Sequence, residues 1–339
     1  MSMAVVSICL FGAVLSWAIA RGMIYCSRRL SLIDIPNERS CHSLPTPRGG
    51  GIGIAAAFFV TGTLLLFNPL LKVTCSIMVV LVAVLANAVL GFLSDRYNLS
   101  EIKRIAAQLL IALAAVIFSG RHDTLEIFGF TLPLAFFGII FFTLWLVAVT
   151  NFYNFMDGID GLAAMQAIFA GLVVAILSFS SANYYLAVLG LCLCAAAAGF
   201  AILNLHPAKI FMGDSGSYMI GFFLACVPLI DGRLFMPIVI TLGLFLFDTI
   251  VTLLRRIYKK EEWYKAHRSH FYQRAVLLGY SHKAVTSVLS WFFIFLSVMA
   301  CFYFYGGMAQ KLVSFILSLI ILSTGAFFVK YKEKQRQKC

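Results

Sequence analysis

The segment from Asn151 to Leu162 reads NFYNFMDGIDGL and places two carboxylates and two amides between long apolar runs. Asp157 and Asp160 are three residues apart, so their side chains share a face if a helix begins here. Ionised groups at the edge of a hydrocarbon layer are rare and usually functional. Two carboxylates this close repel each other unless a proton or a cation lies between them. Mg²⁺ favours such oxygen ligands, so the segment indicates chemistry, the alternative being a helix start capped by an aspartate.

Two polar segments precede it. Residues 34–52 read DIPNERSCHSLPTPRGGGI, where prolines disfavour a helix and Arg39, His42 and Arg48 offer cationic or hydrogen-bonding groups. The glycines that follow open an apolar stretch, and amides at such a helix start suit a phosphate, although a solvated linker explains this segment equally well. Residues 91–104 carry Asp95 beside Arg96. That pair indicates either a site residue or a surface ion pair.

Two more polar segments follow it. Residues 206–218 read HPAKIFMGDSGSY, in which Asp214 precedes Ser-Gly, a position where an aspartate often caps a helix. The long loop at 255–285 holds HRSHFYQR, with His267 and His270 on either side of Arg268. Two histidines three apart are a weak zinc signal, so contact with a diphosphate is favoured over a metal.

The composition indicates that membrane-spanning helices position these residues. Hydrophobic residues make up 62% of the 339, charged residues make up 12%, and the mean hydropathy is +0.95. A helical span needs about 20 apolar residues, and eleven segments qualify: 2–25, 49–67, 73–93, 105–119, 132–150, 160–178, 184–204, 215–230, 234–254, 286–305 and 312–329. The first lacks the basic flank of a signal peptide and is expected to be retained. The sequence therefore predicts an all-α polytopic membrane helix bundle.

The positive charges predict the orientation of this bundle. Of 26 Lys and Arg residues, only Lys72, Arg121, Arg233 and Lys311 lie on the side opposite the C-terminus. Cytoplasmic loops are enriched in Lys and Arg, so we expect the N-terminus outside and cytoplasmic segments near 26–48, 94–104, 151–159, 205–214, 255–285 and 330–339. The excess charge thus reflects topology and contact with membrane lipids, and nucleic acid is not an expected partner.

These motifs together resemble the polyprenyl-phosphate N-acetylhexosamine-1-phosphate transferases, a branch of glycosyltransferase family 4. The resemblance rests on NxxNxxDGxDGLA at Asn151–Ala163, PxPRGGGI at Pro45–Ile52, MGDSGS at Met212–Ser217 and the NLS…K–R…Q pattern at Asn98–Gln108. It implies one transferase domain over 1–339, with a cytoplasm-facing active-site cleft in the bacterial inner membrane. The implied reaction transfers a sugar 1-phosphate from a UDP-N-acetylhexosamine to undecaprenyl phosphate with Mg²⁺ or Mn²⁺, and a homodimer is expected.

The resemblance also implies roles for individual residues. Asp214, helped by Asp95, would hold the metal, while Asp157 and Asp160 would hold the nucleotide-sugar and Asn151 would orient them. Further substrate contacts are expected from Arg39, His42, Arg48, Lys103 and Asn154. His267 and His270, with Arg268, would bind the diphosphate and act in catalysis by offsetting the charge that develops during transfer. One position departs from the family, which usually carries adjacent aspartates where this chain has Ser94-Asp95.

Three alternatives remain. The first is a phospho-N-acetylmuramoyl-pentapeptide transferase, but members of that branch usually carry a run of histidines. The segment HRSHFYQR instead resembles the branch that serves O-antigen and related surface glycans. A member that has lost catalysis through Ser94 is a second alternative. An ion-coupled transporter is a third, but it predicts acids deep within several spans and two related halves. Here the acids gather at loop edges, Asp248 excepted, and no repeat is visible.

Overall fold

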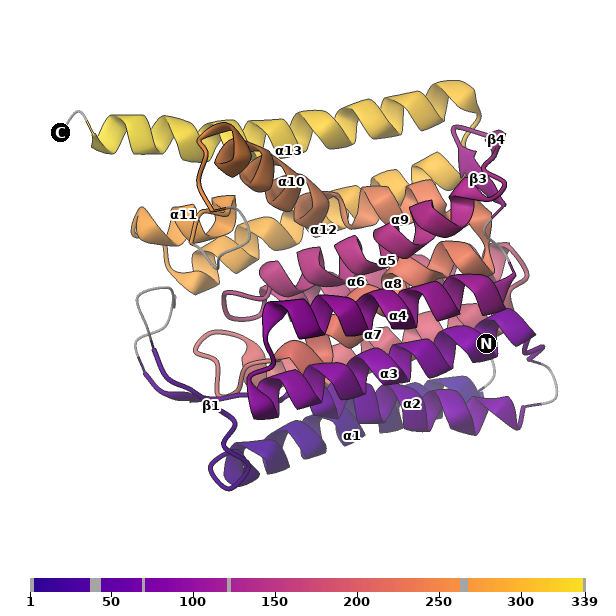
Figure 1. Cartoon of the computed structure of the whole chain (residues 1–339), viewed down its shortest axis with the longest axis horizontal. Coiled ribbons are helices and arrows are strands. Elements are labelled where there is room, and N and C mark those ends of the chain that lie inside the picture. The colour runs from indigo at the N-terminus through magenta and orange to yellow at the C-terminus, as the bar shows by residue number, and fades with distance from the viewer. Residues whose placement is uncertain (1–2, 37–43, 69–70, 121–122, 263–267, 338–339) are drawn as a thin grey trace.

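A computed structural model describes residues 3–36, 44–68, 71–120, 123–262 and 268–337 of the chain. Arg39, His42 and His267 therefore lie outside the described residues, and their predicted substrate contacts stay predictions. Within the described residues the chain is almost entirely helical, and its sheet is limited to two short antiparallel hairpins (Figure 1). These pair β1 (Ile33–Asp34) with β2 (Thr46–Pro47) and β3 (Thr124–Ile127) with β4 (Phe130–Pro133). The all-α membrane class predicted from composition is confirmed.

Each of the eleven predicted segments contains a helix in the structure, although the segment 132–150 begins in β4 and becomes helical at Phe137. The helices are α1 Met3–Cys26, α2 Gly51–Leu66, α3 Cys75–Tyr97, α4 Glu101–Ser119, α5 Phe137–Phe155, α6 Leu162–Ser180, α7 Tyr184–Asn204, α8 Asp214–Ile230, η1 Gly232–Leu234, α9 Phe235–Thr241, α10 Gly243–Tyr258, α11 Phe271–Leu277, α12 His282–Tyr305 and α13 Met308–Arg336. Eight of them are long and apolar enough to cross a membrane, whereas α2 and α8, at 16 and 17 residues, are shorter.

The predicted span at 234–254 is not one straight helix. It consists of the η1–α9 segment and α10, which are bent by 69° relative to each other around Leu242. The break precedes Gly243, and glycine is a common site of helix kinks because it stabilises a helix poorly. Apolar composition alone could not reveal the bend, because both halves are apolar.

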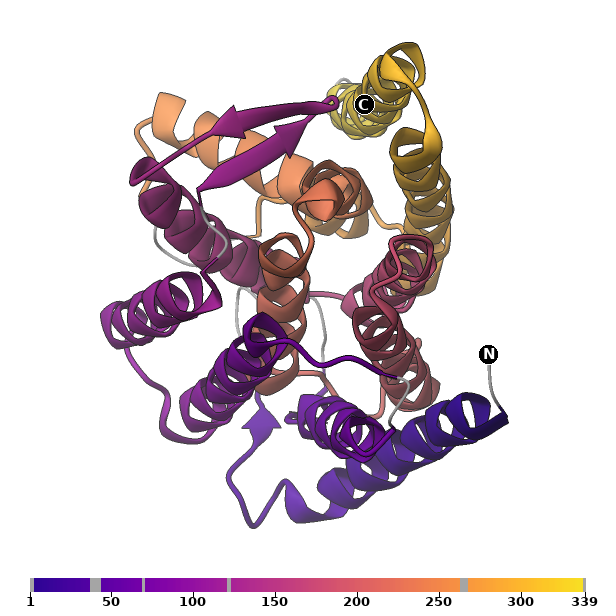
Figure 2. The same ribbon diagram turned by 90° about the vertical axis from the view of Figure 1, so that its right-hand side faces the viewer.

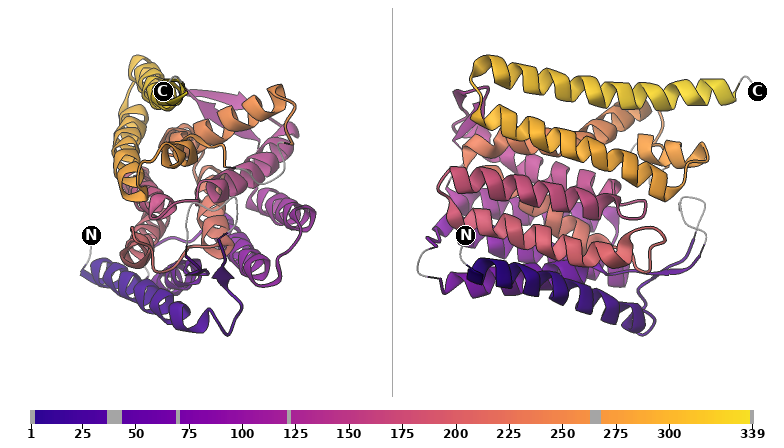
Figure 3. Two further views of the ribbon diagram at one scale, coloured as in Figure 1. Left: turned by 90° about the vertical axis from the view of Figure 1, so that its left-hand side faces the viewer. Right: turned by 180° about the vertical axis from the view of Figure 1, so that it is seen from behind.

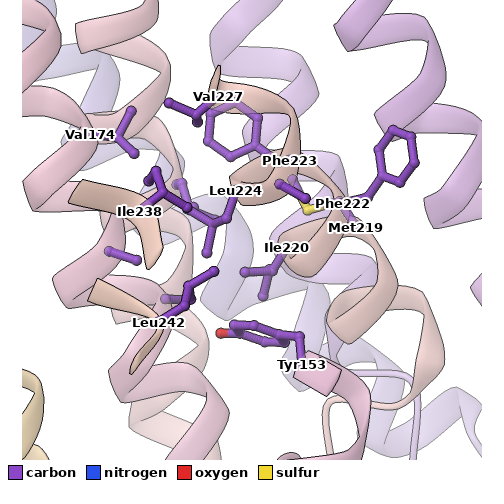
Figure 4. Close-up of a cluster of buried hydrophobic side chains, with 14 of the residues drawn as sticks. Tyr153, Val174, Met219, Ile220, Phe222, Phe223, Leu224, Val227, Ile238 and Leu242 are labelled. Carbon is purple, nitrogen blue, oxygen red and sulfur yellow. The ribbon is translucent and has the colours of Figure 1, made fainter. Parts of the chain in front are cut away.

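Helix α8 forms the centre of the bundle, and all of its residues are buried. It packs against α3, α5 and α2, while α1 and α13 lie at the periphery (Figure 2). Figure 4 shows its side chains Ile220 and Leu224 among Val174 of α6, Ile238 of α9 and Tyr153 of α5. Lipid tails are as apolar as these side chains, so close packing rather than loss of water holds such helices together.

The two ends of the bundle carry different loops. The C-terminus, α11 and the β1–β2 hairpin lie at one end, and the N-terminus and the β3–β4 hairpin lie at the other (Figures 1 and 3). The segments that carry the predicted site residues connect helices at the first of these ends. The helices thus place residues that are far apart in the sequence on one polar end of an apolar bundle.

Candidate active site

Three carboxylates and two guanidinium groups meet where α2, α3, α5 and α8 converge. We call Arg48, Asp95, Arg104, Asp157 and Asp214 the carboxylate cluster. Close approach of the backbones makes this convergence possible. A Cβ added to Gly51 would lie 2.3 Å from the Cα of Gly216, and one added to Gly91 would lie 2.3 Å from the carbonyl oxygen of Asp214.

Asp214 accepts hydrogen bonds at both of its carboxylate oxygens. Its Oδ1 accepts from the Asn154 amide at 3.0 Å and from Arg48 at 3.2 Å. Its Oδ2 accepts from the Ser94 hydroxyl at 2.7 Å and from Arg104 at 3.3 Å. None of these bonds caps the helix that Asp214 begins, so the helix-cap interpretation of this residue does not describe the observed geometry.

Asp95 supplies the cap that α8 needs. Its Oδ1 and Oδ2 accept hydrogen bonds from the backbone amides of Asp214 and Ser215, at 3.0 and 3.1 Å. The positive end of a helix dipole stabilises a carboxylate placed there. Arg48 Nε also lies 3.0 Å from Asp95 Oδ1, whereas Arg96 donates to the carbonyl of Leu30. The interpretation of Asp95 and Arg96 as a surface ion pair is therefore wrong.

Asp157 joins the cluster from the loop between α5 and α6. Burial raises the pKa of its carboxyl well above the usual range; the charge of Arg48 opposes this rise, and the charges of Asp214 and Asp95 add to it. The backbone amide of Gly213 donates a hydrogen bond to it. Gly213 has a φ of +76°, and a Cβ there would lie 2.7 Å from Asp95 Oδ2, so no larger residue fits.

Arg48 is the cation in closest contact with two of these carboxylates. Burial lowers the pKa of its guanidinium, but the charges of Asp95 and Asp214 outweigh burial and raise it. The amides of Gly50 and Gly51, next along the chain, donate to the carbonyls of Phe211 and Met212. The expectation that these glycine amides bind phosphate is therefore wrong, because they tie the start of α2 to the segment before α8.

Sequence reasoning assigned no site role to Arg104 or Tyr218, although Arg104 is the arginine of the K–R pattern. Arg104 reaches Asp214 and the hydroxyl of Tyr218, at 3.1 Å, while the neighbouring Lys103 is exposed. A role for Lys103 in substrate binding stays a prediction. Asn151 donates to Gln108, at 2.7 Å, and to a backbone carbonyl, so the described contacts link it to α4.

Asp160 has partners of its own outside the carboxylate cluster. Its carboxylate lies next to His206 and His282, two histidines that the sequence did not single out. Helix α6 begins only at Leu162, with Gly161 as its N-cap, so Asp157 and Asp160 lie in a loop rather than on one helical face. Burial raises the pKa of the Asp160 carboxyl, but the influence of the nearby imidazoles of His282 and His206 outweighs burial and lowers it.

The segment that contains Arg268 and His270 is anchored by a carboxylate from inside the bundle. Asp248 of α10 lies 3.1 Å from His270 Nδ1 and accepts from the amides of Phe271 and Tyr272, which begin α11. The Tyr272 hydroxyl then donates to the carbonyl of Phe155, at 2.9 Å. This chain of contacts couples α11 to the loop that holds Asp157. Contacts of Arg268 and His270 with a diphosphate stay predictions.

Comparison with known proteins gives a consistent result. Residues 77–231 match the family model described as glycosyl transferase family 4. A probable undecaprenyl-phosphate N-acetylglucosaminyl 1-phosphate transferase of Bacillus subtilis is 30% identical over 77% of this chain and 74% of its own length. A decaprenyl-phosphate N-acetylglucosaminephosphotransferase of Mycobacterium leprae is 28% identical over 78% and 74%. A phospho-N-acetylmuramoyl-pentapeptide-transferase of a Geobacillus strain is 30% identical over 70% and 76%.

Proposed function

Because this chain belongs to glycosyl transferase family 4, as a membrane enzyme that transfers a phosphosugar to a polyprenyl phosphate, we propose that its donor is UDP-N-acetylglucosamine. We further propose undecaprenyl phosphate as the acceptor. The products would be UMP and the first lipid-linked intermediate of a surface glycan such as O-antigen. The names of the Bacillus and Mycobacterium relatives support this donor.

The charge balance of the carboxylate cluster is the observation that carries the proposal. Among the described residues, the cations that act on Asp95, Asp157 and Asp214 are Arg48 and Arg104, which leaves one formal negative charge when all three carboxyls are ionised. Such an excess favours a cation. The carboxylates of the cluster offer oxygen atoms as ligands, and Mg²⁺ prefers oxygen ligands. The residues of the cluster therefore fit the predicted divalent ion.

Asp214 and Asp157 would hold that ion, with Asp95 fixing the helix that Asp214 begins. The Asp214 carboxylate accepts four hydrogen bonds in the structure, two at each oxygen. The contacts to Arg48 and Arg104, at 3.2 and 3.3 Å, are the longest of the four and the most easily replaced. A bound divalent ion would neutralise charge on the donor diphosphate.

The transfer itself needs little proton chemistry from the protein. A phosphate monoester has its second pKa near ~6, so the lipid phosphate is mostly a dianion at neutral pH. One of its oxygens would attack the β-phosphorus of the UDP-sugar, and the bond from that phosphorus to the bridging oxygen would break to release UMP. Asn154 would keep the Asp214 carboxylate oriented, and the cationic side chains of Arg48 and Arg104 would offset negative charge at the transferred group.

The remaining assignments follow the same proposal. The whole chain would act as one domain in the bacterial inner membrane, with the carboxylate cluster facing the cytoplasm. The unequal division of Lys and Arg between the two sides supports that orientation. A homodimer stays a prediction, which light scattering of the detergent-solubilised protein would test.

The decisive experiment measures UMP release by purified protein with undecaprenyl phosphate and Mg²⁺. We expect release with UDP-N-acetylglucosamine, none with chelator, and a loss of about a hundredfold or more for Asp214→Asn. Asn keeps the shape of Asp while it removes the charge, so folding should survive. Faster release with UDP-N-acetylmuramoyl-pentapeptide would instead favour the pentapeptide branch, and near wild-type turnover of Asp214→Asn would refute its metal role.

A further inference from the structure

A second group of potential metal ligands lies beside the carboxylate cluster. Asp160 precedes α6, His206 lies in the segment between α7 and α8, and His282 begins α12. His206 Nδ1 lies 2.6 Å from Asp160 Oδ2, and His282 Nδ1 lies 3.2 Å from Asp160 Oδ1. One ligand atom from each residue falls within 4.8 Å of the other two. We call these residues the histidine cluster.

The backbone around the histidine cluster is fixed by hydrogen bonds to three elements. The carbonyl of Asp160 accepts from Thr286 of α12 at 2.8 Å, and its carboxylate accepts from the amide of Ala208 at 3.2 Å. The next amide, of Gly161, donates to Asn204 at the end of α7. The carboxylate is therefore held in place between both histidines, and ligands held in this way bind a metal at a lower cost in ordering.

One imidazole nitrogen in the cluster lacks a satisfactory partner. His282 Nδ1 is buried and, although it lies near Asp160, it makes no hydrogen bond of acceptable geometry. A buried polar atom without a partner destabilises the fold. The His282 side chain is 11% exposed, whereas that of His206 is 39% exposed, which opens one side of the cluster to solvent.

We propose that the histidine cluster binds a transition-metal ion, Zn²⁺ being the best match. Zinc sites that keep an open position use three protein ligands, and two imidazoles with one carboxylate form a common set. Bonds of about 2.0–2.1 Å in a tetrahedron separate the ligand atoms by roughly 3.3 Å. The pair of Asp160 and His282, at 3.2 Å, matches that spacing, and the pair of Asp160 and His206, at 2.6 Å, would have to separate when a metal binds. The unpartnered nitrogen of His282 would gain the metal as its partner.

The imidazole ligands would make this site distinct from the carboxylate cluster. Mg²⁺ seldom uses nitrogen ligands, so each cluster would select a different ion. A metal at the histidine cluster would tie the segments that precede α6, α8 and α12 to one another. The proposal does not depend on which sugar nucleotide the enzyme uses, and its test reads metal content rather than turnover.

The test uses full-length protein in detergent after removal of any histidine tag. Protein equilibrated with zinc and then dialysed should retain one ion per chain by elemental analysis, also with excess Mg²⁺ present. Cobalt in place of zinc should give visible absorption of a tetrahedral site without the charge-transfer band of a thiolate. That second readout separates this site from binding by cysteines.

Matched variants separate metal binding from hydrogen bonding. Asn can donate a hydrogen bond to Asp160 as an imidazole does, but it is a poor zinc ligand, so His206→Asn and His282→Asn should each weaken zinc binding at least tenfold. Lys283→Ala, which changes the exposed neighbour of His282, should bind zinc as the wild type does. The proposal fails if the wild type retains no zinc, or if both Asn variants retain it unchanged, because the cluster is then only a hydrogen-bonded group.

Discussion

Ser94 shows how a single neutral side chain can be built into a charged site. Its hydroxyl donates to Asp214 at 2.7 Å, while the next residue, Asp95, caps α8. A carboxylate at position 94 would face Asp214 as a like charge instead of donating to it. The departure from the family pattern is therefore matched by a specific contact.

We accordingly expect Ser94→Asp to give no large gain in activity. Repulsion from Asp214 should offset any help that the added carboxylate gives to the metal, and the lipid phosphate is already largely ionised. Turnover and the Mg²⁺ concentration for half activity are the measurements, with Ser94→Ala as the control for loss of the hydroxyl. A rise in turnover beyond about tenfold, which corresponds to roughly 1.4 kcal/mol of activation free energy, would mean that Ser94 lowers the activity of the natural enzyme.

Asp157 leads to a prediction about pH. Burial, with the charges of Asp214 and Asp95, raises the pKa of its carboxyl in the folded protein. A raised carboxyl pKa means that the folded state binds this proton more tightly than the unfolded state does, so the associated stability is lost as pH rises. The loss begins above the ordinary carboxyl value of about 3.9 and ends at the raised one.

Without divalent ions, Asp157→Asn should therefore raise the melting temperature at neutral pH and abolish activity. Saturating Mg²⁺ should reduce the difference in melting temperature, because the ion offsets the buried charge of the wild type. Melting curves at several pH values with and without Mg²⁺ are the measurement. A lower melting temperature for the variant under all conditions would show that the carboxylate stabilises the fold.

Helix α11 illustrates how an element far too short to fold alone is fixed. Isolated helices of this length are unstable in water, yet Asp248 accepts from its first amides and Arg274 forms an ion pair with Glu333 of α13. Arg336 of α13 also donates to the carbonyl of Leu277, at 2.8 Å. The helix is thus held at its start by α10 and along its length by the end of α13.

Asp248→Ala should loosen α11 and lower activity, because it leaves buried amides without an acceptor at a cost of about 1–3 kcal/mol. The measurement is the rate of limited proteolysis within residues 255–285, compared with the rate of UMP release. Thr252→Val is the control, since it removes only the hydroxyl that donates to Asp248 Oδ1. Unchanged proteolysis in Asp248→Ala would show that α13 alone holds α11.

At the scale of helices, the sequence predicted which segments are helical but not which residues at the helix ends contact one another. Long apolar runs gave the helices, while the bend before Gly243 left no signal in hydropathy. Asp214 and Asn154 were predicted because their motif is distinctive. Arg104 lies within the quoted K–R pattern, but its neighbour Lys103 was assigned the role. His206 and His282 could not be predicted in the same way, because their importance comes from contacts with a residue more than 40 positions away.

The whole molecule has two ends of different character, and this leads to a prediction of topology. The C-terminus and the candidate site lie at one end, opposite the N-terminus (Figure 1). Positive charge should hold the C-terminal end in the cytoplasm. A single cysteine near Lys311 should react with an impermeant reagent in intact cells, whereas one near Lys265 should react only after permeabilisation. The reverse pattern would overturn the orientation.

The burial of α8 at the centre of the bundle has a consequence for the order of biosynthesis. Arg48 and Asp214 are 166 positions apart, and Ser94 and Asp214 are 120 apart. At about 5–20 residues per second, a ribosome delivers Asp214 on the order of ten seconds or more after Arg48. In that interval Arg48 and Asp95 have been synthesised, whereas α8, whose first amides Asp95 caps, has not. Insertion of α8 then gives the Asp95 carboxylate the helix amides that it caps, brings Asp214 to Arg48, and fills the centre of the bundle in the same step.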